Sequence, residues 1–274
     1  MFNVDTQKVH SHKTPKIIPF PFTFAHHTFE VPSVSVVVPA MNEAKNLPHV
    51  LPYIPGWVHE IILVDGNSKD DTVAVALQLC PDKLRVITQS GRGKGTALRD
   101  GFAAATGDII VMIDADGSML PQEIPLYVGA LLAGADFVKG SRFMQGGGTD
   151  DMELYRYFGN LGLTMVVRIL FGARYSDLCY GYAAFWRRVL PKLNLESTGF
   201  EIETEMNVRA IKAKLKIAEV PSFEEPRIYG TSNLNTIRDG FRVLRQILKE
   251  FVVQFKPSNQ AIQNQNLKRD LQTT

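Results

Sequence analysis

Short apolar runs alternate with longer mixed segments over the first half of the chain. Runs rich in Val and Ile predict strands at residues 34–38, 60–64, 84–88, 109–113 and 136–140. Segments with helical spacing are expected between them, at residues 72–79, 95–105 and 121–134, with a shorter one beginning at 46–51. Strands that are apolar throughout are typical of a parallel sheet covered on both faces, so we expect an α/β fold with a mostly parallel sheet flanked by helices.

The pattern changes after about residue 140. A loop of three glycines at 146–148 is followed by a helical stretch, an irregular aromatic segment at 175–186, and further helices. We expect a single α/β domain at 33–256, whose second half forms an acceptor site. An extended lead-in at 1–32, rich in proline, precedes it, and a mobile polar tail at 257–274 follows it.

Composition narrows the class of protein. The chain has 274 residues, 45% of them hydrophobic and 21% charged, with a net charge of +2, which is typical of a globular protein and gives no indication of nucleic-acid binding. Cys80 and Cys179 lie far apart without metal-ligand spacing, which fits a reducing compartment. The polar first residues do not resemble a secretory signal, and no apolar stretch is long enough to span a bilayer. We therefore expect a cytoplasmic protein that is soluble or peripheral.

Polar clusters follow four of the predicted strands. They lie at residues 39–43, at Asp65, at 91–95 and at 114–116. Ligands of open α/β sheets bind outside the carboxyl ends of the strands, so these clusters are expected to meet in one crevice.

Asp114 and Asp116 leave the strand at 109–113 two residues apart. Both carboxylates can point the same way and suit Mg²⁺ or Mn²⁺ bound against a substrate diphosphate. The sequence DADG on its own also fits a simple turn. Its place after a buried strand and beside the other clusters favours the metal site.

The segment SGRGKG at residues 90–95 precedes a predicted helix. Its backbone N–H groups, Arg92 and Lys94 could meet phosphate oxygens, although its spacing is not that of a Walker loop. A flexible surface turn is the alternative interpretation.

The ordered motifs resemble a known family. VSVVVPAMNEAKNL, ILVDGNSKDDT, GRGKGTALRDGF, IIVMIDADGSMLP and KGSRF, within residues 34–249, resemble glycosyltransferase family 2, above all its dolichyl- and polyprenyl-phosphate hexosyltransferases. The resemblance implies the Rossmann-like GT-A fold, inversion at the anomeric carbon, and a GDP- or UDP-linked sugar as donor. Gly66 and Ser118 depart from the family pattern, which often has Asp and Gln there.

The resemblance also implies roles for single residues. Pro39, Glu43 and Asp65 would contact the nucleobase and ribose, Asp114 would lie near the ribose and diphosphate, and Asp116 would be the main metal ligand. Lys94 is a further cation for the charge of the leaving group.

The resemblance places an acceptor phosphate in the second half of the chain. The residues expected to grip it are Arg142, Arg156, Arg227 and Ser232, because guanidinium groups pair with phosphate oxygens in a bidentate manner. A polyprenyl phosphate is already anionic and needs positioning more than deprotonation. A sugar hydroxyl would instead need a general base, for which Asp177 is the first candidate, followed by Glu201 and Glu203.

The stretch at 236–256 has an amphipathic pattern. Apolar residues recur at helical spacing beside a basic stripe of Arg238, Arg242, Arg245 and Lys249; they are Ile237, Phe241, Leu244, Leu248 and Phe251. Such a helix can pack on the protein's own core, which is the default, or lie on an anionic membrane surface.

Two other classes of protein share some of these features. A sugar nucleotidyltransferase would carry a glycine-rich signature where this chain has PAMNEAKN. A non-catalytic scaffold protein would not need Asp114, Asp116 and three arginines that could bind phosphate. Both are less favoured than a glycosyltransferase, whose acceptor can be a polyprenyl phosphate or a soluble hydroxyl compound.

Overall fold

The computed structural model describes residues 31–231 and 235–253. The predicted lead-in lies almost wholly outside the described residues, and the predicted tail at 257–274 lies entirely outside them. None of the helices within the described part is long and apolar enough to cross a membrane.

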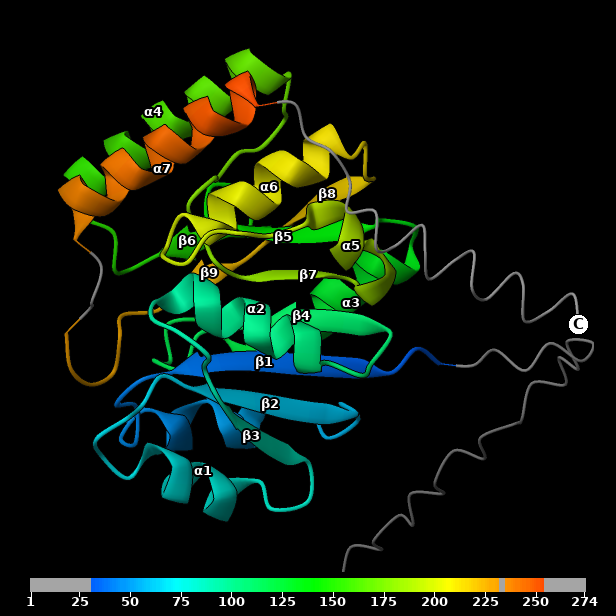
Figure 1. The fold of residues 1–274 in the computed structure, drawn as a ribbon, viewed down its shortest axis with the longest axis vertical. Helices are drawn as coiled ribbons and strands as arrows, with labels where there is room; N and C mark the ends of the chain where they lie inside the picture. Colours follow the sequence, from blue (N-terminus) through cyan, green and yellow to red (C-terminus); the bar gives the residue numbers. More distant parts are fainter. Residues whose placement is uncertain (1–30, 232–234, 254–274) are drawn as a thin grey trace, which may run out of the picture. The chain divides into compact units, whose positions relative to one another are not determined.

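A seven-stranded sheet forms the centre of the described structure, in the order β3-β2-β1-β4-β7-β5-β8 (Figure 1). Its strands are β1 (Val34–Ala40), β2 (Glu60–Asp65), β3 (Leu84–Thr88), β4 (Ile109–Met112), β5 (Phe137–Ser141), β7 (Ala183–Trp186) and β8 (Ile217–Pro221). Only β7 runs antiparallel to its neighbours β4 and β5. The expected mostly parallel α/β sheet is therefore confirmed.

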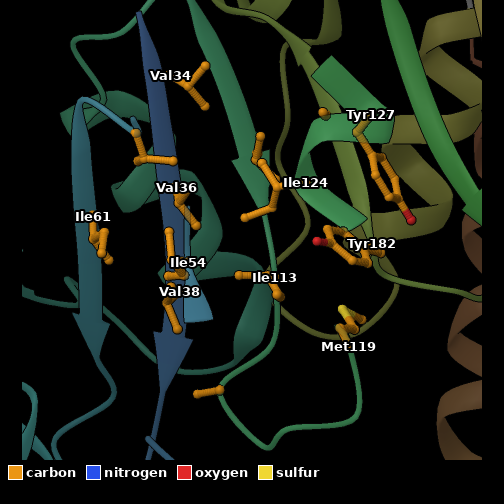
Figure 2. Packing of buried hydrophobic residues seen from close by; sticks show 14 of the residues in the cluster. Val34, Val36, Val38, Ile54, Ile61, Ile113, Met119, Ile124, Tyr127 and Tyr182 are labelled. Atoms are coloured by element: carbon orange, nitrogen blue, oxygen red, sulfur yellow. The ribbon is translucent and has the colours of Figure 1, made fainter. Parts of the chain in front are cut away.

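Both faces of the sheet are buried, as a strand apolar throughout requires. Val34, Val36 and Val38 of β1 point into one apolar cluster, where Figure 2 shows them together with Ile113 and Ile124. Val37 points into a second cluster on the opposite face. This alternation follows from the pleat of the strand.

Helices cover both faces. The helices and 3₁₀ turns are η1 (Leu47–His49), η2 (Leu51–Tyr53), α1 (Thr72–Leu79), α2 (Lys94–Ala104), η3 (Pro121–Glu123), α3 (Ile124–Leu132), α4 (Leu154–Phe171), η4 (Arg187–Val189), α5 (Leu190–Leu193), α6 (Ile202–Lys212) and α7 (Thr236–Val252). Residues of η1, η2, α1 and α3 join the first cluster, and residues of α2, α5 and α6 join the second. A separate pair of strands, β6 (Gly148–Thr149) and β9 (Phe223–Glu224), lies beside the main sheet.

α4 and α7 form an outer layer. The two helices run side by side beyond α6, which separates them from the sheet (Figure 1). Phe171 near the end of α4 meets Phe251 of α7 edge to face, with ring centroids 5.9 Å apart.

Three local expectations were wrong. The helix expected from residue 46 is replaced by η1 and η2, because Pro48 and Pro52 remove the backbone donors that a longer helix needs. The aromatic segment at 175–186 ends in β7, which fits between β4 and β5. The strand β8 was not expected, and its partner β5 lies far away in sequence.

Candidate functional site

The carboxyl ends of β1, β2 and β4 meet at one edge of the sheet. These strands are parallel neighbours, and Pro39 and Ala40 pair with Val64 and Asp65 at that edge. Asp65 accepts a hydrogen bond from the backbone N–H of Ser68, at 3.2 Å. The loop after β1 joins the loop after β2, because the backbone N–H of Glu43 donates to Thr72 Oγ1 at 2.8 Å. The clusters predicted to converge are therefore neighbours.

Asp114 is held by a cation. Lys94, at the start of α2, lies with its Nζ 2.7 Å from a carboxylate oxygen of Asp114 and 2.7 Å from one of Glu203 on α6. Burial raises the pKa of Asp114 to about 6, and the charge of Lys94 opposes that rise. Burial lowers the pKa of Lys94, but the two carboxylates outweigh it and raise the pKa above its ordinary value. Lys94 therefore stays charged at the strand end.

Asp116 lies in a tight turn and is shared between two partners. Its Oδ1 accepts hydrogen bonds from the backbone N–H and the hydroxyl of Ser118, at 3.1 and 2.8 Å. Its Oδ2 faces Arg227 Nη1 at 3.1 Å, while Nη2 of the same guanidinium lies 2.5 Å from Glu43. Gly117 has a φ of +83°, which a residue with a side chain rarely adopts. The segment DADG therefore forms a turn, and this turn is compatible with the metal-binding role predicted for Asp116.

The segment at 223–229, of which only β9 is a strand, crosses the strand ends. The backbone N–H of Glu225 donates to Ser118 O at 2.9 Å, and that of Tyr229 donates to Asn46 Oδ1 at 2.9 Å. Between this segment and the loop after β1 lies a cavity of about 390 Å³. It is lined by Met41, Asn42, Lys45, Asn46, Asp70, Arg227, Tyr229, Gly230 and Thr231.

Arg142 and Asp177 form a buried ion pair. Arg142 Nε lies 2.7 Å from Asp177, its Nη1 lies 2.9 Å from Glu224, and Asn160 donates to Asp177 at 2.7 Å. Burial alone would raise the pKa of Asp177, but Lys139 and Arg142 lower it to about 2. A buried, fully ionised carboxylate with these partners is a weak base, so the geometry argues against Asp177 as the general base. The same burial keeps the Arg142 guanidinium from reaching a phosphate directly.

The other predicted acceptor residues are more open. Arg156 in α4 is half-buried and lies 3.7 Å from Asp151. Burial raises the pKa of Asp151, and the negative charges of Glu224 and Asp116 raise it further. Arg156, Arg227 and Arg142 thus border one group of carboxylates. Ser232 lies outside the described residues.

The glycine-rich loop differs from its expectation. The backbone N–H groups of Gly95 and Thr96 both donate to the carbonyl oxygen of Thr198, at 2.9 and 3.3 Å. Gly95 is packed so tightly that an added Cβ would lie 2.5 Å from Ser197 O. These two amides hold the end of the loop against the chain before α6, so they are not available to a phosphate. The roles predicted for Arg92 and for the remaining amides of the loop stay predictions.

The carboxylates of the site suit a divalent cation whose remaining ligands come from water and the substrate. Within residues 31–231 and 235–253, no group of three or more His, Cys, Asp or Glu is gathered to hold a metal alone. Mg²⁺ and Mn²⁺ sites that handle phosphates commonly use one or two carboxylates, with the remaining ligands supplied by water and phosphate oxygens. Asp116, with Asp114 beside it, provides such a pair.

Two residues of the site, Glu224 and Asn160, were not predicted from the sequence. Glu224 accepts from Arg142 and from Thr149 Oγ1, at 2.9 and 2.7 Å, and Asn160 holds Asp177. Glu224 and Glu225 stand just before Arg227 in FEEPR, so this pair of acids could have indicated Glu224 as a site residue from the sequence. Asn160 lies within an apolar helix, where a lone amide gives little indication of its partner.

Known proteins share this sequence and fold. The model of the family described as "Glycosyl transferase family 2" matches residues 35–193. Polyprenol monophosphomannose synthase of Mycolicibacterium smegmatis is 32% identical over 216 residues, which cover 73% of this chain and 80% of that protein. Dolichol-phosphate mannosyltransferase of Pyrococcus furiosus is 33% identical over 227 residues, covering 79% of this chain but only 64% of that longer protein.

Solved structures agree with the fold. Glucosyl-3-phosphoglycerate synthase from Mycobacterium tuberculosis, in complex with Mn²⁺, UDP and glucosyl-3-phosphoglycerate, superimposes with a TM-score of 0.63 at 26% identity, over 82% of each chain. The sheet order, the strand-end carboxylates and the family match lead to one conclusion: this chain belongs to glycosyltransferase family 2 and has its GT-A fold.

Proposed function

We propose that this enzyme transfers a hexose, with inversion, from a nucleoside-diphosphate sugar to a polyprenyl or dolichyl phosphate. The observation that carries the proposal is the ion pair between Lys94, at the start of α2, and Asp114, just after β4. Asp116, two residues further on, pairs with Arg227, and Arg156 pairs with Asp151. The named relatives, a polyprenol monophosphomannose synthase and a dolichol-phosphate mannosyltransferase, support this class of acceptor.

The donor side is assigned to the strand ends. Pro39, Glu43 and Asp65 would face the base and ribose. None of the three lines the cavity beside Asn42 and Tyr229, although Glu43 pairs with Arg227, which does line it. Asp116 and Asp114 would hold Mg²⁺ or Mn²⁺ together with the diphosphate, and the ion would stabilise the negative charge of the leaving group. Lys94 adds a fixed positive charge in a partly buried place, where it acts more strongly than in water.

The acceptor side is assigned to the arginines. Arg156 and Arg227 are each paired with a carboxylate, at 3.7 and 3.1 Å, and could exchange that partner for a phosphate. Arg142 would act indirectly, because its ion pair with Asp177 and Glu224 fixes the wall of the site. An acceptor phosphate carries its own negative charge, so positioning replaces deprotonation.

A soluble hydroxyl acceptor is the second candidate. The similar glucosyl-3-phosphoglycerate synthase was solved with such an acceptor, phosphoglyceric acid, at 28% identity to this chain. That reaction needs a general base, and Glu203 is the better candidate because its side chain is less buried than that of Asp177 and shares Lys94 with Asp114. Asp177 is too deeply paired for that role.

A lipid acceptor places the enzyme at a membrane. We assign the contact to residues 236–256, of which 236–253 are described, and the location to the cytoplasmic face. Both GDP-linked and UDP-linked sugars are candidate donors.

A two-step assay tests the function. Nucleotide sugars, with GDP-mannose and UDP-glucose among them, are first screened for thermal stabilisation of the protein with Mn²⁺. The stabilising donor, radiolabelled, is then supplied with polyprenyl phosphate or with phosphoglyceric acid. We expect label to enter the lipid fraction only; label in the soluble product alone would favour the second candidate.

A further inference from the structure

α7 buries Val243 and Ile247 on its inner side but also carries an apolar stripe that faces outward. Ile237 and Phe241 are 75% and 69% exposed, and Leu248 and Phe251 are also exposed. The default expectation, that this stripe packs on the core, is therefore wrong for these four residues; Leu244 alone is half-buried. Large apolar side chains in a row on a surface mark an interaction site.

Buried polar residues fix α7 in this orientation. Asp239, Gln246 and Glu250 lie on the inner side of the helix. Glu250 pairs with Arg209 at 2.8 Å and with Lys212 at 2.9 Å, both on α6. Rotating the helix to bury Phe241 would break these buried pairs, which is strongly unfavourable.

α4 repeats the arrangement. Its inner face carries Asn160 and Thr164, and Thr164 Oγ1 accepts from the backbone N–H of Leu178 at 3.2 Å. Its outer face carries exposed apolar residues at helical spacing, namely Leu154, Phe158, Leu161, Met165 and Ile169. α4 and α7 lie side by side over α6 (Figure 1). Phe171 of α4 contacts Phe251 of α7, so the outer faces of the two helices adjoin.

Within the two helices themselves, the exposed charges have a single sign; the nearby exposed acids are Glu153, just before α4, and Glu196, which pairs with Lys249. The only acids within α4 and α7, both fully described, are the buried Asp239 and Glu250. The exposed charged residues of the two helices are all basic: Arg168, Arg238, Arg242, Arg245 and Lys249. Apolar side chains flanked by Arg and Lys match the interface of a membrane with anionic headgroups.

The surface reaches the candidate acceptor site. Tyr157 of α4 packs edge to face on Phe143, with centroids 5.1 Å apart, and Phe143 lies beside the guanidinium of Arg142. A lipid chain leaving the acceptor site at this end of α4 would therefore meet the apolar surface directly.

We propose that the outer faces of α4 and α7 together form a docking surface that seats the enzyme in the interface of an anionic bilayer. The assignment rests on the proposed function, since it explains how a lipid-borne phosphate reaches the site. The α7 helix does not act alone: α4 supplies the half of the surface nearest the acceptor site.

Vesicle flotation of the full chain tests the surface without any polyprenyl phosphate. Vesicles of phosphatidylcholine alone are compared with vesicles that also contain phosphatidylglycerol. We expect the I237S/F241S variant and, on α4, the F158S/I169S variant each to lower the partition coefficient by about tenfold or more. The R245Q variant should lower it by about fivefold on anionic vesicles only. The control variant L77S/L132S removes two exposed leucines from α1 and α3 and should bind like the wild type.

A second arm separates docking from catalysis. The I237S/F241S variant should keep its activity on a short, water-soluble prenyl phosphate and lose it on a long-chain acceptor embedded in vesicles. Wild-type protein that stays off anionic vesicles would overturn the proposal, as would unchanged binding by both serine variants. A dimer in light scattering that these substitutions dissociate, without vesicle binding, would assign the surface to a second copy instead. Flotation without transfer to any prenyl phosphate would support the docking surface and refute the proposed function.

Discussion

At the scale of single residues, the site depends on charges that are paired before any ligand arrives. Arg142 with Asp177, Lys94 with Asp114 and Glu203, and Arg227 with Asp116 all lie within 3.1 Å of a partner oxygen. The first pair is buried and structural, whereas the last is partly open and borders the cavity. The two kinds of pair should respond differently to substitution.

Loss of Arg142 should destabilise the fold. The R142M variant leaves the buried carboxylate of Asp177 without its main partner, and we expect a loss of about 3–5 kcal/mol in the free energy of unfolding. Adding D177N removes the uncompensated charge and should restore part of the loss. Urea unfolding of the wild type, both single variants and the double variant measures this. Wild-type stability in R142M would contradict the structural role.

Asp177 should also make stability depend on acidic pH. Its pKa lies at about 2 in the folded protein against an ordinary 3.8, so its contribution is complete above about pH 5 and lost as the pH falls through 4 toward 2. The difference corresponds to about 2 kcal/mol. Urea unfolding across this range should show a steeper fall for the wild type than for D177N. Parallel curves would refute the paired, ionised state of Asp177.

Arg227 should compete with a metal ion. Its guanidinium lies 3.1 Å from Asp116 and 2.5 Å from Glu43, so a cation at Asp116 meets a positive charge already in place. We expect R227Q to raise the affinity for Mn²⁺, measured without nucleotide, by about fivefold. This is the change that corresponds to the free energy of one partly exposed ion pair, about 1 kcal/mol. Electron paramagnetic resonance of free Mn²⁺ measures it, with R188Q, an exposed arginine paired with Asp136, as control. Equal or weaker binding in R227Q would contradict this competition.

At the scale of elements, close packing of α2 on the sheet sets the position of Lys94. An added Cβ at Gly101 would lie 2.4 Å from Val37 Cγ1 and 2.9 Å from Val64 Cγ2, whereas one at Gly129 of α3 would meet nothing within 4 Å. Both glycines are within helices, so they differ in packing and not in secondary structure.

This contrast gives a matched pair of variants. G101A should destabilise the protein by about 1–3 kcal/mol through overpacking. G129A should be neutral or stabilising by up to about 1 kcal/mol, because alanine favours the helix. Thermal unfolding compares them. Equal effects of the two substitutions would refute the close contact between α2 and β1.

The sequence pattern was reliable for elements whose signal is local. The strands at 34–38, 60–64 and 84–88 and the helix at 72–79 were found within two residues of the expected bounds. β7 and β8 were missed because their short apolar runs become strands only through partners distant in sequence. The spacing in α7 identified a helix and its apolar stripe, but not that buried ion pairs to α6 turn this stripe outward.

At the scale of the whole molecule, the proposed donor site lies at one edge of the sheet. The proposed membrane surface lies on the outer layer formed by α4 and α7. The parallel order β3-β2-β1-β4 brings together the carboxylates that we propose bind the donor, and this convergence was predictable from strand ends. The acceptor-side pairings were not, since Arg142, Asp177 and Glu224 come from three segments that meet only in the folded chain. α4 links the acceptor side to the surface proposed to face the membrane.

Calorimetry of donor binding tests the central claim most directly. The affinity of the stabilising nucleotide sugar is measured with and without Mn²⁺ for the wild type, for D116A and for D82A. The last removes an exposed acid just before β3, at the edge of the sheet opposite the site. The account predicts that Mn²⁺ strengthens donor binding in the wild type and in D82A, and that D116A loses this dependence while it remains folded, with a cooperative thermal transition. Undiminished Mn²⁺-dependent affinity in D116A would contradict it.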